Sequence, residues 1–145
     1  METSIVGVWK LLTIVYVSGA DVSKVDPALP GLFIFSEDYY SMTWMPQQKF
    51  QEEYADLWHP SDAEKVQSYN SIVTNTGRYE VTNGELTTYV EVAKTPAFVG
   101  GKAIYDCEIT GDILRLEVKD NVAHDGTRDE SYLKFKTILT LERVE

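Results

Sequence analysis

Both ends of this chain carry strand-like sequence, and each end contains a residue that would complement the other if they lay side by side. Residues 5–16 are rich in Val, Ile, Leu and Thr and contain Gly7 and Trp9 near their start. Residues 132–144 alternate apolar and polar side chains and contain Arg143 near their end. If the two strands pair, the guanidinium of Arg143 can lie over the indole face of Trp9. Such pairing closes a sheet into a barrel, which leaves no exposed edge.

The sequence between these ends alternates in the same way and carries turn signals at even spacing. The predicted strands are residues 5–16, 31–35, 39–45, 77–82, 86–92, 103–109, 114–118 and 132–144. Asn83-Gly84 is a typical two-residue hairpin turn. Residues 18–30 contain Gly19 and two prolines and are predicted to be a loop. The pattern predicts an all-β fold in which about eight antiparallel strands form one barrel domain over residues 1–145.

Strict alternation assigns the side chains of each strand to the inside or the outside of the barrel. The predicted inward row of the first strand is Trp9, Leu11, Thr13 and Val15. Its predicted outward row is Leu12, Ile14 and Tyr16. The predicted inward row of residues 86–92 is Leu86, Thr88, Val90 and Val92. Because the outward row of the first strand is also apolar, it requires a cover, which could be a helix or a second subunit.

Residues 50–73 change from a period of two to the spacing of helices. Phe50, Tyr54, Leu57 and Trp58 fall at i, i+4, i+7 and i+8, which is one face of a helix. Ser61 and Glu64 have the spacing of a capping box ahead of a second helical pattern. We therefore expect an insert of two short helices between the third and fourth predicted strands. Two roles are open for it: a lid or plug at one barrel end, or a cover for the outward row of the first strand.

The charge and the cysteine content exclude several classes of function. The chain has 13 Lys and Arg against 23 Asp and Glu, a net charge of −10. This balance argues against binding to nucleic acid or to an anionic membrane surface. A single cysteine, Cys107, cannot form an intramolecular disulfide. The short polar start and the absence of a run of about 20 apolar residues predict an intracellular, cytoplasmic protein.

No motif for catalysis, metal binding or cofactor binding stands out. The two histidines, His59 and His124, are far apart in the sequence and fall in predicted turns or loops, so we expect no metal site. No glycine-rich phosphate loop or Gly-x-Ser-x-Gly elbow is present, and no cofactor is expected. Cys107 lies in a predicted inward row and is interpreted as a small buried hydrophobic residue rather than a nucleophile.

The aromatic content is the remaining signal for a site. The candidate ligand-binding residues are Tyr40, Trp44, Tyr79, Thr88, Tyr105 and Phe135. Aromatic rings offer stacking walls, and tyrosine hydroxyls can orient a polar ligand atom. The candidate acid–base residues are Tyr79, Tyr105 and His59. The alternative interpretation is a filled core whose tyrosine hydroxyls reach the rim.

Several stretches in order resemble the lipocalin-like domain family of bacteria and fungi. They are Ile-Val-Gly-Val-Trp-Lys-Leu at residues 5–11, Gly-Leu-Phe-Ile-Phe at residues 31–35, Gly-Arg-Tyr-Glu-Val at residues 77–81 and Leu-Thr-Leu-Glu-Arg-Val at residues 139–144. The resemblance spans nearly the whole chain. It implies a small calycin-type barrel with an internal cavity, and it implies little about function because most members have no assigned role.

Three functions are compatible with these residues. The first is a protein that encloses a small apolar or aromatic molecule in its barrel. The second is a cofactor-independent cyclase or isomerase that acts by confinement on a polyketide or terpenoid biosynthetic intermediate, by analogy at the level of the fold. The third is an interaction module, in which the outward row of the first strand with Tyr16 pairs two subunits into a homodimer.

Overall fold

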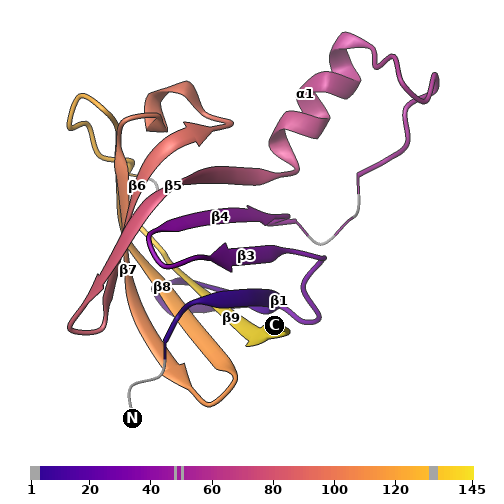
Figure 1. Cartoon of the computed structure of the whole chain (residues 1–145). Coiled ribbons are helices and arrows are strands. Elements are labelled where there is room, and N and C mark those ends of the chain that lie inside the picture. The colour runs from indigo at the N-terminus through magenta and orange to yellow at the C-terminus, as the bar shows by residue number, and fades with distance from the viewer. Residues whose placement is uncertain (1–3, 48, 50, 131–133) are drawn as a thin grey trace.

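The computed structural model describes residues 4–47, 49, 51–130 and 134–145, and these residues form a mostly β structure (Figure 1). The strands are β1 (Gly7–Ser18), β2 (Asp21–Val25), β3 (Leu32–Phe35), β4 (Tyr39–Trp44), β5 (Val73–Thr82), β6 (Glu85–Ala93), β7 (Lys102–Thr110), β8 (Ile113–Val122) and β9 (Lys136–Arg143). The helices are α1 (Asp62–Asn70) and the short 3-10 helix η1 (Pro96–Phe98). The prediction of an all-β fold is confirmed.

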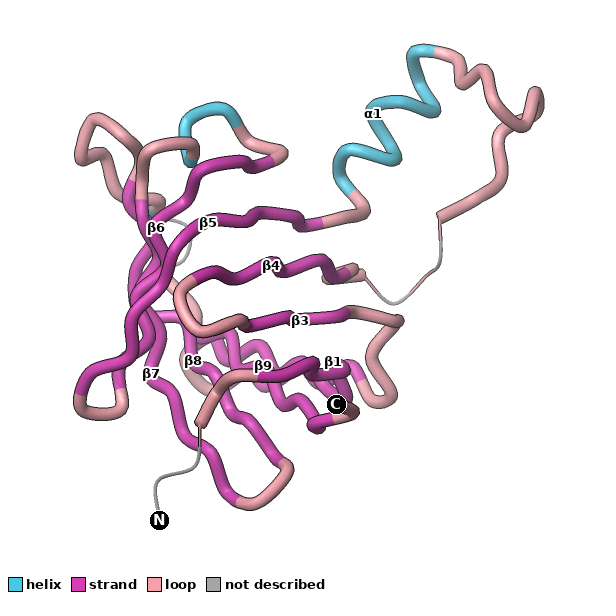
Figure 2. Tube along the Cα trace, viewed as in Figure 1, coloured by secondary structure: helices cyan, strands magenta, loops and turns pink. Residues whose placement is uncertain are grey.

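Eight of these strands close into an antiparallel barrel. The strand order is β1-β3-β4-β5-β6-β7-β8-β9, and β9 pairs back with β1 (Figure 2). The additional strand β2 pairs with the second half of β1, from Ile14 opposite Val25 to Ser18 opposite Asp21. The prediction of a loop over residues 18–30 is wrong for β2. All side chains of β2 except Val25 are exposed, so the strand carries no alternation that a sequence pattern could detect.

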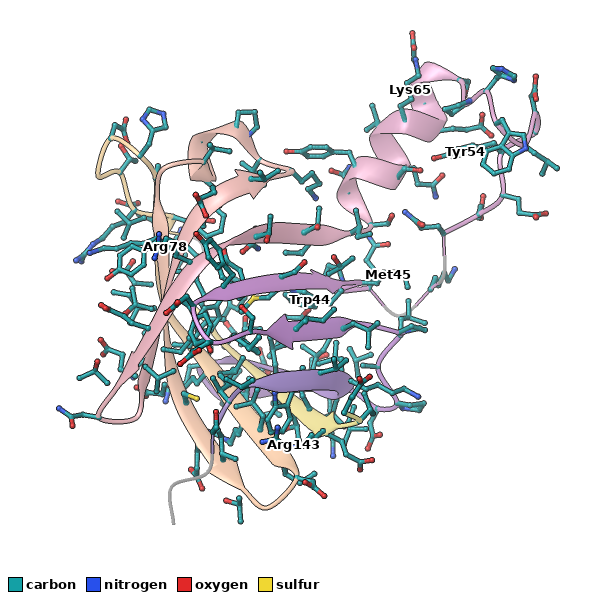
Figure 3. All side chains as sticks on the ribbon, in the orientation of Figure 1. Trp44, Met45, Tyr54, Lys65, Arg78 and Arg143 are labelled. Atoms are coloured by element: carbon teal, nitrogen blue, oxygen red, sulfur yellow. The ribbon has the colours of Figure 1, made fainter. Side chains whose placement is uncertain are left out.

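The predicted contact between the two chain ends is confirmed and closes one end of the barrel. Trp9 is opposite Arg143 in the β1–β9 pair and is fully buried. The Arg143 guanidinium lies 4.3 Å from the centre of the indole ring. Its Nη1 and Nη2 donate to the carbonyl oxygens of Val6 and Ser4 at 2.6 and 2.7 Å. These contacts tie the start of the chain to its last strand, and Figure 3 shows Arg143 at this end of the barrel.

A β-bulge in β1 reverses the predicted inward and outward faces in the second half of this strand. Leu11 is opposite Leu141 and Thr13 is opposite Thr140, so Leu12 is an extra residue without a partner on β9. One extra residue reverses the inside and outside faces of the strand beyond it. As a result Ile14 is fully buried and Tyr16 packs against the core, although both were predicted to face outward. The homodimer stays a prediction, but it can no longer rest on an outward Tyr16.

Two further bulges act in the same way on β6 and β8. On β6, Val90 is opposite Gly77 and Val92 is opposite Thr76, which leaves Glu91 as the extra residue. Val92 is therefore 63% exposed, and its predicted inward position is wrong. On β8, Lys119 is the extra residue between the partners of Ile104 and Tyr105. Because bulges bend strands and re-aim side chains, both change what lines the barrel beyond them.

The helical insert is one helix between β4 and β5, not the expected pair. The capping box of α1 is confirmed, since Ser61 N–H donates to Glu64 Oε1 and Glu64 N–H donates to Ser61 Oγ. No helix forms over residues 51–60, where Trp58 is 86% exposed, and Phe50 lies outside the described residues. Short helices with little packing are marginal, and the capping box favours the second segment over the first, which has none. The third and fourth predicted strands correspond to β4 and β5, because β2 was missed.

The position of α1 excludes one of the two roles that were expected for the insert. None of its residues is buried. In Figures 1 and 2 the helix and the loop before it project away from the barrel, beyond β5 and on the far side of β3 and β4 from β1. The Tyr69 hydroxyl lies 3.3 Å from Thr95 Oγ1, at the open end of the barrel described below. The helix therefore does not cover the outer face of β1.

Candidate functional site

The connections between antiparallel strands alternate between the two ends of the barrel. The turns at residues 36–38, 83–84 and 111–112 lie at the closed end, with Trp9 and Arg143. The other end carries the connections at residues 26–31, 94–101 and 123–130, and the segment that leads to α1. A cavity of about 430 Å³ lies at this open end.

The walls of the cavity are mostly apolar. The largest apolar side chains that line it are Trp44, Val73, Phe98, Tyr105, Val118 and Leu139. Three alanines, Ala93, Ala97 and Ala123, line it as well and leave space where larger side chains would fill the barrel. A concave cavity of this size with mainly apolar walls is typical of small-molecule sites.

The rim of the cavity is held by hydrogen bonds between two loops. His124 N–H donates to the Ala97 carbonyl at 3.0 Å, which joins the loop after β8 to η1. Ala123 N–H donates to the Thr127 carbonyl at 2.8 Å, and Val122 forms an isolated bridge with Arg128. These bonds fix the loop of residues 123–130 at the edge of the cavity.

One buried polar pair stands behind the cavity wall. Asn75 on β5 lines the cavity and is only 5% exposed. Its Oδ1 accepts a hydrogen bond of 2.6 Å from the hydroxyl of Tyr40, which is buried on β4. Burial raises the pKa of Tyr40 to about 12. The phenol therefore keeps its proton at neutral pH and is the donor of this bond.

The two cations that line the cavity are already engaged by the protein. Lys94 Nζ donates to the carbonyl oxygens of Tyr69 and Ile72 and lies 4.2 Å from the centre of the Tyr69 ring. Arg128 Nε lies 3.2 Å from Asp120 Oδ2. Lys94 is therefore held by neutral groups, whereas the charge of Arg128 is paired with a carboxylate.

The structure brings three of the predicted site residues to the cavity or next to it, and a fourth is buried elsewhere on the inner face of the barrel. Trp44 and Tyr105 line it directly, and the Tyr105 hydroxyl donates to Met42 Sδ at 3.8 Å. Tyr40 lies behind Asn75, as described above. Thr88 is fully buried on β6 opposite Tyr79 and is not among the residues that line the cavity. All four residues are buried, which agrees with their predicted inward parity.

The other three predicted site residues do not line the cavity. Tyr79 lies at the closed end, where its hydroxyl donates to the Ser36 carbonyl and its ring packs edge-on against Phe35 at 5.2 Å. His59 is exposed in the loop before α1, with Nδ1 3.2 Å from Asp56 Oδ1. Phe135 packs edge-on against Tyr16 at a ring distance of 6.2 Å. The loop before α1 carries His59 away from the barrel, and this placement gives no support to an acid–base role at the cavity.

Sequence reasoning missed the polar residues of the site. Asn75 precedes Gly77 by two positions and shares its face, but the predicted strand began only at Gly77. Asn121 lines the cavity because the bulge at Lys119 reverses the faces of β8 beyond it. An earlier start for the strand would have found Asn75. No sequence signal marks the bulge.

Three further observations limit the chemistry of the described residues. Burial raises the pKa of the Cys107 thiol to about 11, which disfavours the nucleophilic thiolate. Within the described part of the chain, no three His, Cys, Asp or Glu side chains are placed to hold a metal ion together. The described helices are also too short or too polar to cross a membrane.

Comparison with known proteins gives a family and a similar solved structure. A family model described as a lipocalin-like domain matches residues 6–144. No curated protein matches this sequence. Among solved structures, this chain is similar to an uncharacterized protein from Bacteroides eggerthii DSM 20697, with 14% sequence identity and a TM-score of 0.46. That alignment covers 94% of this chain and 98% of the other.

Proposed function

Because the chain belongs to the lipocalin-like domain family, we propose that it binds a small, largely apolar molecule at the open end of its barrel. The observation that carries this proposal is the cavity of about 430 Å³, whose walls are apolar on most sides. Aromatic walls from Trp44, Phe98 and Tyr105 favour a flat or aromatic ligand, since rings stack and pack edge-on against one another.

The proposal is tested by filling the cavity. Ala93 lines it, whereas the adjacent Val92 faces outward because of the bulge at Glu91. In Ala93→Trp the indole occupies the space of the ligand, and Val92→Trp is the matched control with the same side chain outside. Native mass spectrometry of protein purified from its producing cells should detect a bound small molecule in the wild type and in Val92→Trp, and lose it in Ala93→Trp.

Two outcomes would contradict this proposal. A bound molecule that persists unchanged in a folded Ala93→Trp variant would lie elsewhere on the protein. A wild-type protein that carries no molecule and fails to bind the aromatic probes described below would also reject the proposal. Circular dichroism of both variants checks that the barrel is intact.

A second candidate is a cyclase or isomerase that acts mainly by confinement on a polyketide or terpenoid intermediate. Tyr105 favours it, because this is the candidate acid–base residue whose side chain lines the cavity. A shaped cavity can lower a barrier by holding a reactive conformation, and a hydroxyl can assist proton transfer. The experiment compares the molecule recovered from the protein with its cellular precursor. An isomer or a dehydrated form supports catalysis, and unchanged turnover by Tyr105→Phe removes that hydroxyl from the mechanism.

A further inference from the structure

The side chain of Asn75 points to a specific feature of the ligand. We infer that the ligand carries an uncharged hydrogen-bond acceptor, such as a ketone, ester or amide carbonyl, which binds Asn75 Nδ2, and that Tyr40 is the positioning residue for this amide. This inference rests on the proposed function, because it concerns a molecule in the same cavity. It adds the chemical group by which that molecule is recognised.

The first step concerns the direction of the amide. An asparagine amide has an acceptor end and a donor end, and their assignment follows from their partners. The protonated hydroxyl of Tyr40 lies 2.6 Å from Oδ1 of Asn75 and donates to it. Oδ1 is thereby directed towards β4, and the amino group is the end that remains for the cavity. Tyr40 thus sets the orientation of Asn75 without lining the cavity itself.

The second step concerns the unused donor. Among the described residues, none accepts a hydrogen bond from Asn75 Nδ2, although Asn75 is only 5% exposed. This nitrogen is not among the fully enclosed polar atoms that lack a partner, so it is the part of the side chain that a molecule in the cavity can reach. Asn75 lies directly opposite Ala93 on β6, whose methyl group leaves room beside the amide. A ligand oxygen in the cavity would complete this pair.

The third step concerns the charge of the acceptor. Lys94 Nζ donates to two backbone carbonyl oxygens and Arg128 is paired with Asp120, as described above. A carboxylate ligand would have to compete with these partners for either cation. An uncharged carbonyl needs only the amide donor, so it fits the cavity best.

The test uses two probes that differ only in the acceptor, 2-acetylnaphthalene and 2-ethylnaphthalene, with affinities measured by equilibrium dialysis. In Asn75→Leu the ketone should lose about tenfold in affinity, while the hydrocarbon binds as before or more tightly. In Tyr40→Phe the amide remains but loses its anchor, so the ketone should lose about threefold and the hydrocarbon should be unaffected.

A spectroscopic readout separates positioning from general damage to the barrel. The carbonyl stretch of bound ¹³C-labelled ketone should lie at lower frequency in the wild type than in Asn75→Leu, since a hydrogen bond weakens the C=O bond. Tyr40→Phe should give two bands, because the amide can then take both orientations. A band at the free position in the wild-type protein overturns the inference even if Asn75→Leu does not fold.

The remaining outcomes distinguish this inference from the proposed function. Equal changes for ketone and hydrocarbon in Asn75→Leu overturn the role of the amide and leave the cavity as a binding site. Failure of both probes to bind the folded wild type rejects the site itself. Preserved selectivity for the ketone in Asn75→Leu would place its acceptor contact at another residue.

Discussion

The two ends of this barrel are built from the same strands but differ in how completely they are filled. At the closed end, large side chains such as Trp9, Phe33 and Phe35 fill the interior, and Trp9 Nε1–H donates to the Ile5 carbonyl at 2.8 Å. At the open end, alanines replace large residues and Asn75 keeps an unused donor. Close packing with complete hydrogen bonding stabilises a fold, whereas incomplete packing leaves room for a ligand. We therefore expect the closed end to contribute most of the stability and the open end to hold the proposed ligand.

The largest expected difference between the ends is in the unfolding free energy that is lost when a tryptophan is replaced by alanine. Trp9→Ala should cost about 3–5 kcal/mol of unfolding free energy, because it leaves a large void and removes the ring beneath Arg143. Trp44→Ala should cost less, about 2 kcal/mol, because one side of Trp44 already borders the cavity. Urea denaturation measures both. Equal losses would show that the open end is packed as tightly as the closed one and would break the comparison.

The pH dependence of stability tests the polar pair behind the cavity. Burial raises the pKa of Tyr40 from 10.0 to about 12 in the folded state. Below pH 10 both states are protonated and this contribution is fully present. Above it the unfolded state loses its proton first, so the stability falls by about 2–3 kcal/mol as the pH rises towards 12. In Tyr40→Phe this part of the decline should be absent, which urea denaturation at pH 9 to 12 measures. An identical decline in the variant would mean that the folded phenol titrates normally.

The closed end is the part of the fold that could be predicted correctly from the sequence. Trp9 and Arg143 were paired from their positions alone, because only a closed sheet brings the first and last strands together. The hairpin turn was equally accessible, since Asn83 and Gly84 adopt the positive φ angles of 52° and 76° that their sequence favours. Local chemistry and strong alternation determine these features, so they can be predicted without a structure.

The open end depended on features that leave no trace in a pattern of apolar and polar residues. The extra residues Leu12, Glu91 and Lys119 each reverse the faces of a strand near this end. They move Tyr16 inward, Val92 outward and Asn121 into the cavity wall. A bulge is stabilised by its partner strand rather than by its own residues, so alternation predicts the wrong face beyond it. The candidate site was therefore predicted only where strict parity holds, as at Trp44 and Tyr105.

A smaller loss of unfolding free energy is expected when the contacts of Arg143 at the closed end are weakened. Arg143→Lys keeps the positive charge but loses the planar fork that bonds Val6 and Ser4 while stacking on Trp9. We expect a loss of about 1–2 kcal/mol in unfolding free energy, with unchanged affinity for 2-acetylnaphthalene, since the cavity is at the other end. Urea denaturation and equilibrium dialysis measure the two quantities. A loss of affinity comparable to the loss of stability would show that the two ends are coupled.

The smallest global effect is expected at α1, which projects beyond the open end (Figure 3). The helix buries none of its residues and is held by its capping box, by a hydrogen bond of 2.5 Å between the Tyr54 and Ser68 hydroxyls, and by the contacts of Tyr69 with Lys94 and Thr95. Ser61→Ala removes the cap and should destabilise the helix by about 1 kcal/mol. Because the barrel core does not depend on this helix, the urea midpoint should stay nearly constant while amide hydrogen exchange accelerates within α1. A matching fall in the midpoint would instead show that α1 and the open end unfold together, and the filled, closed end would then not be the sole source of the stability of the barrel.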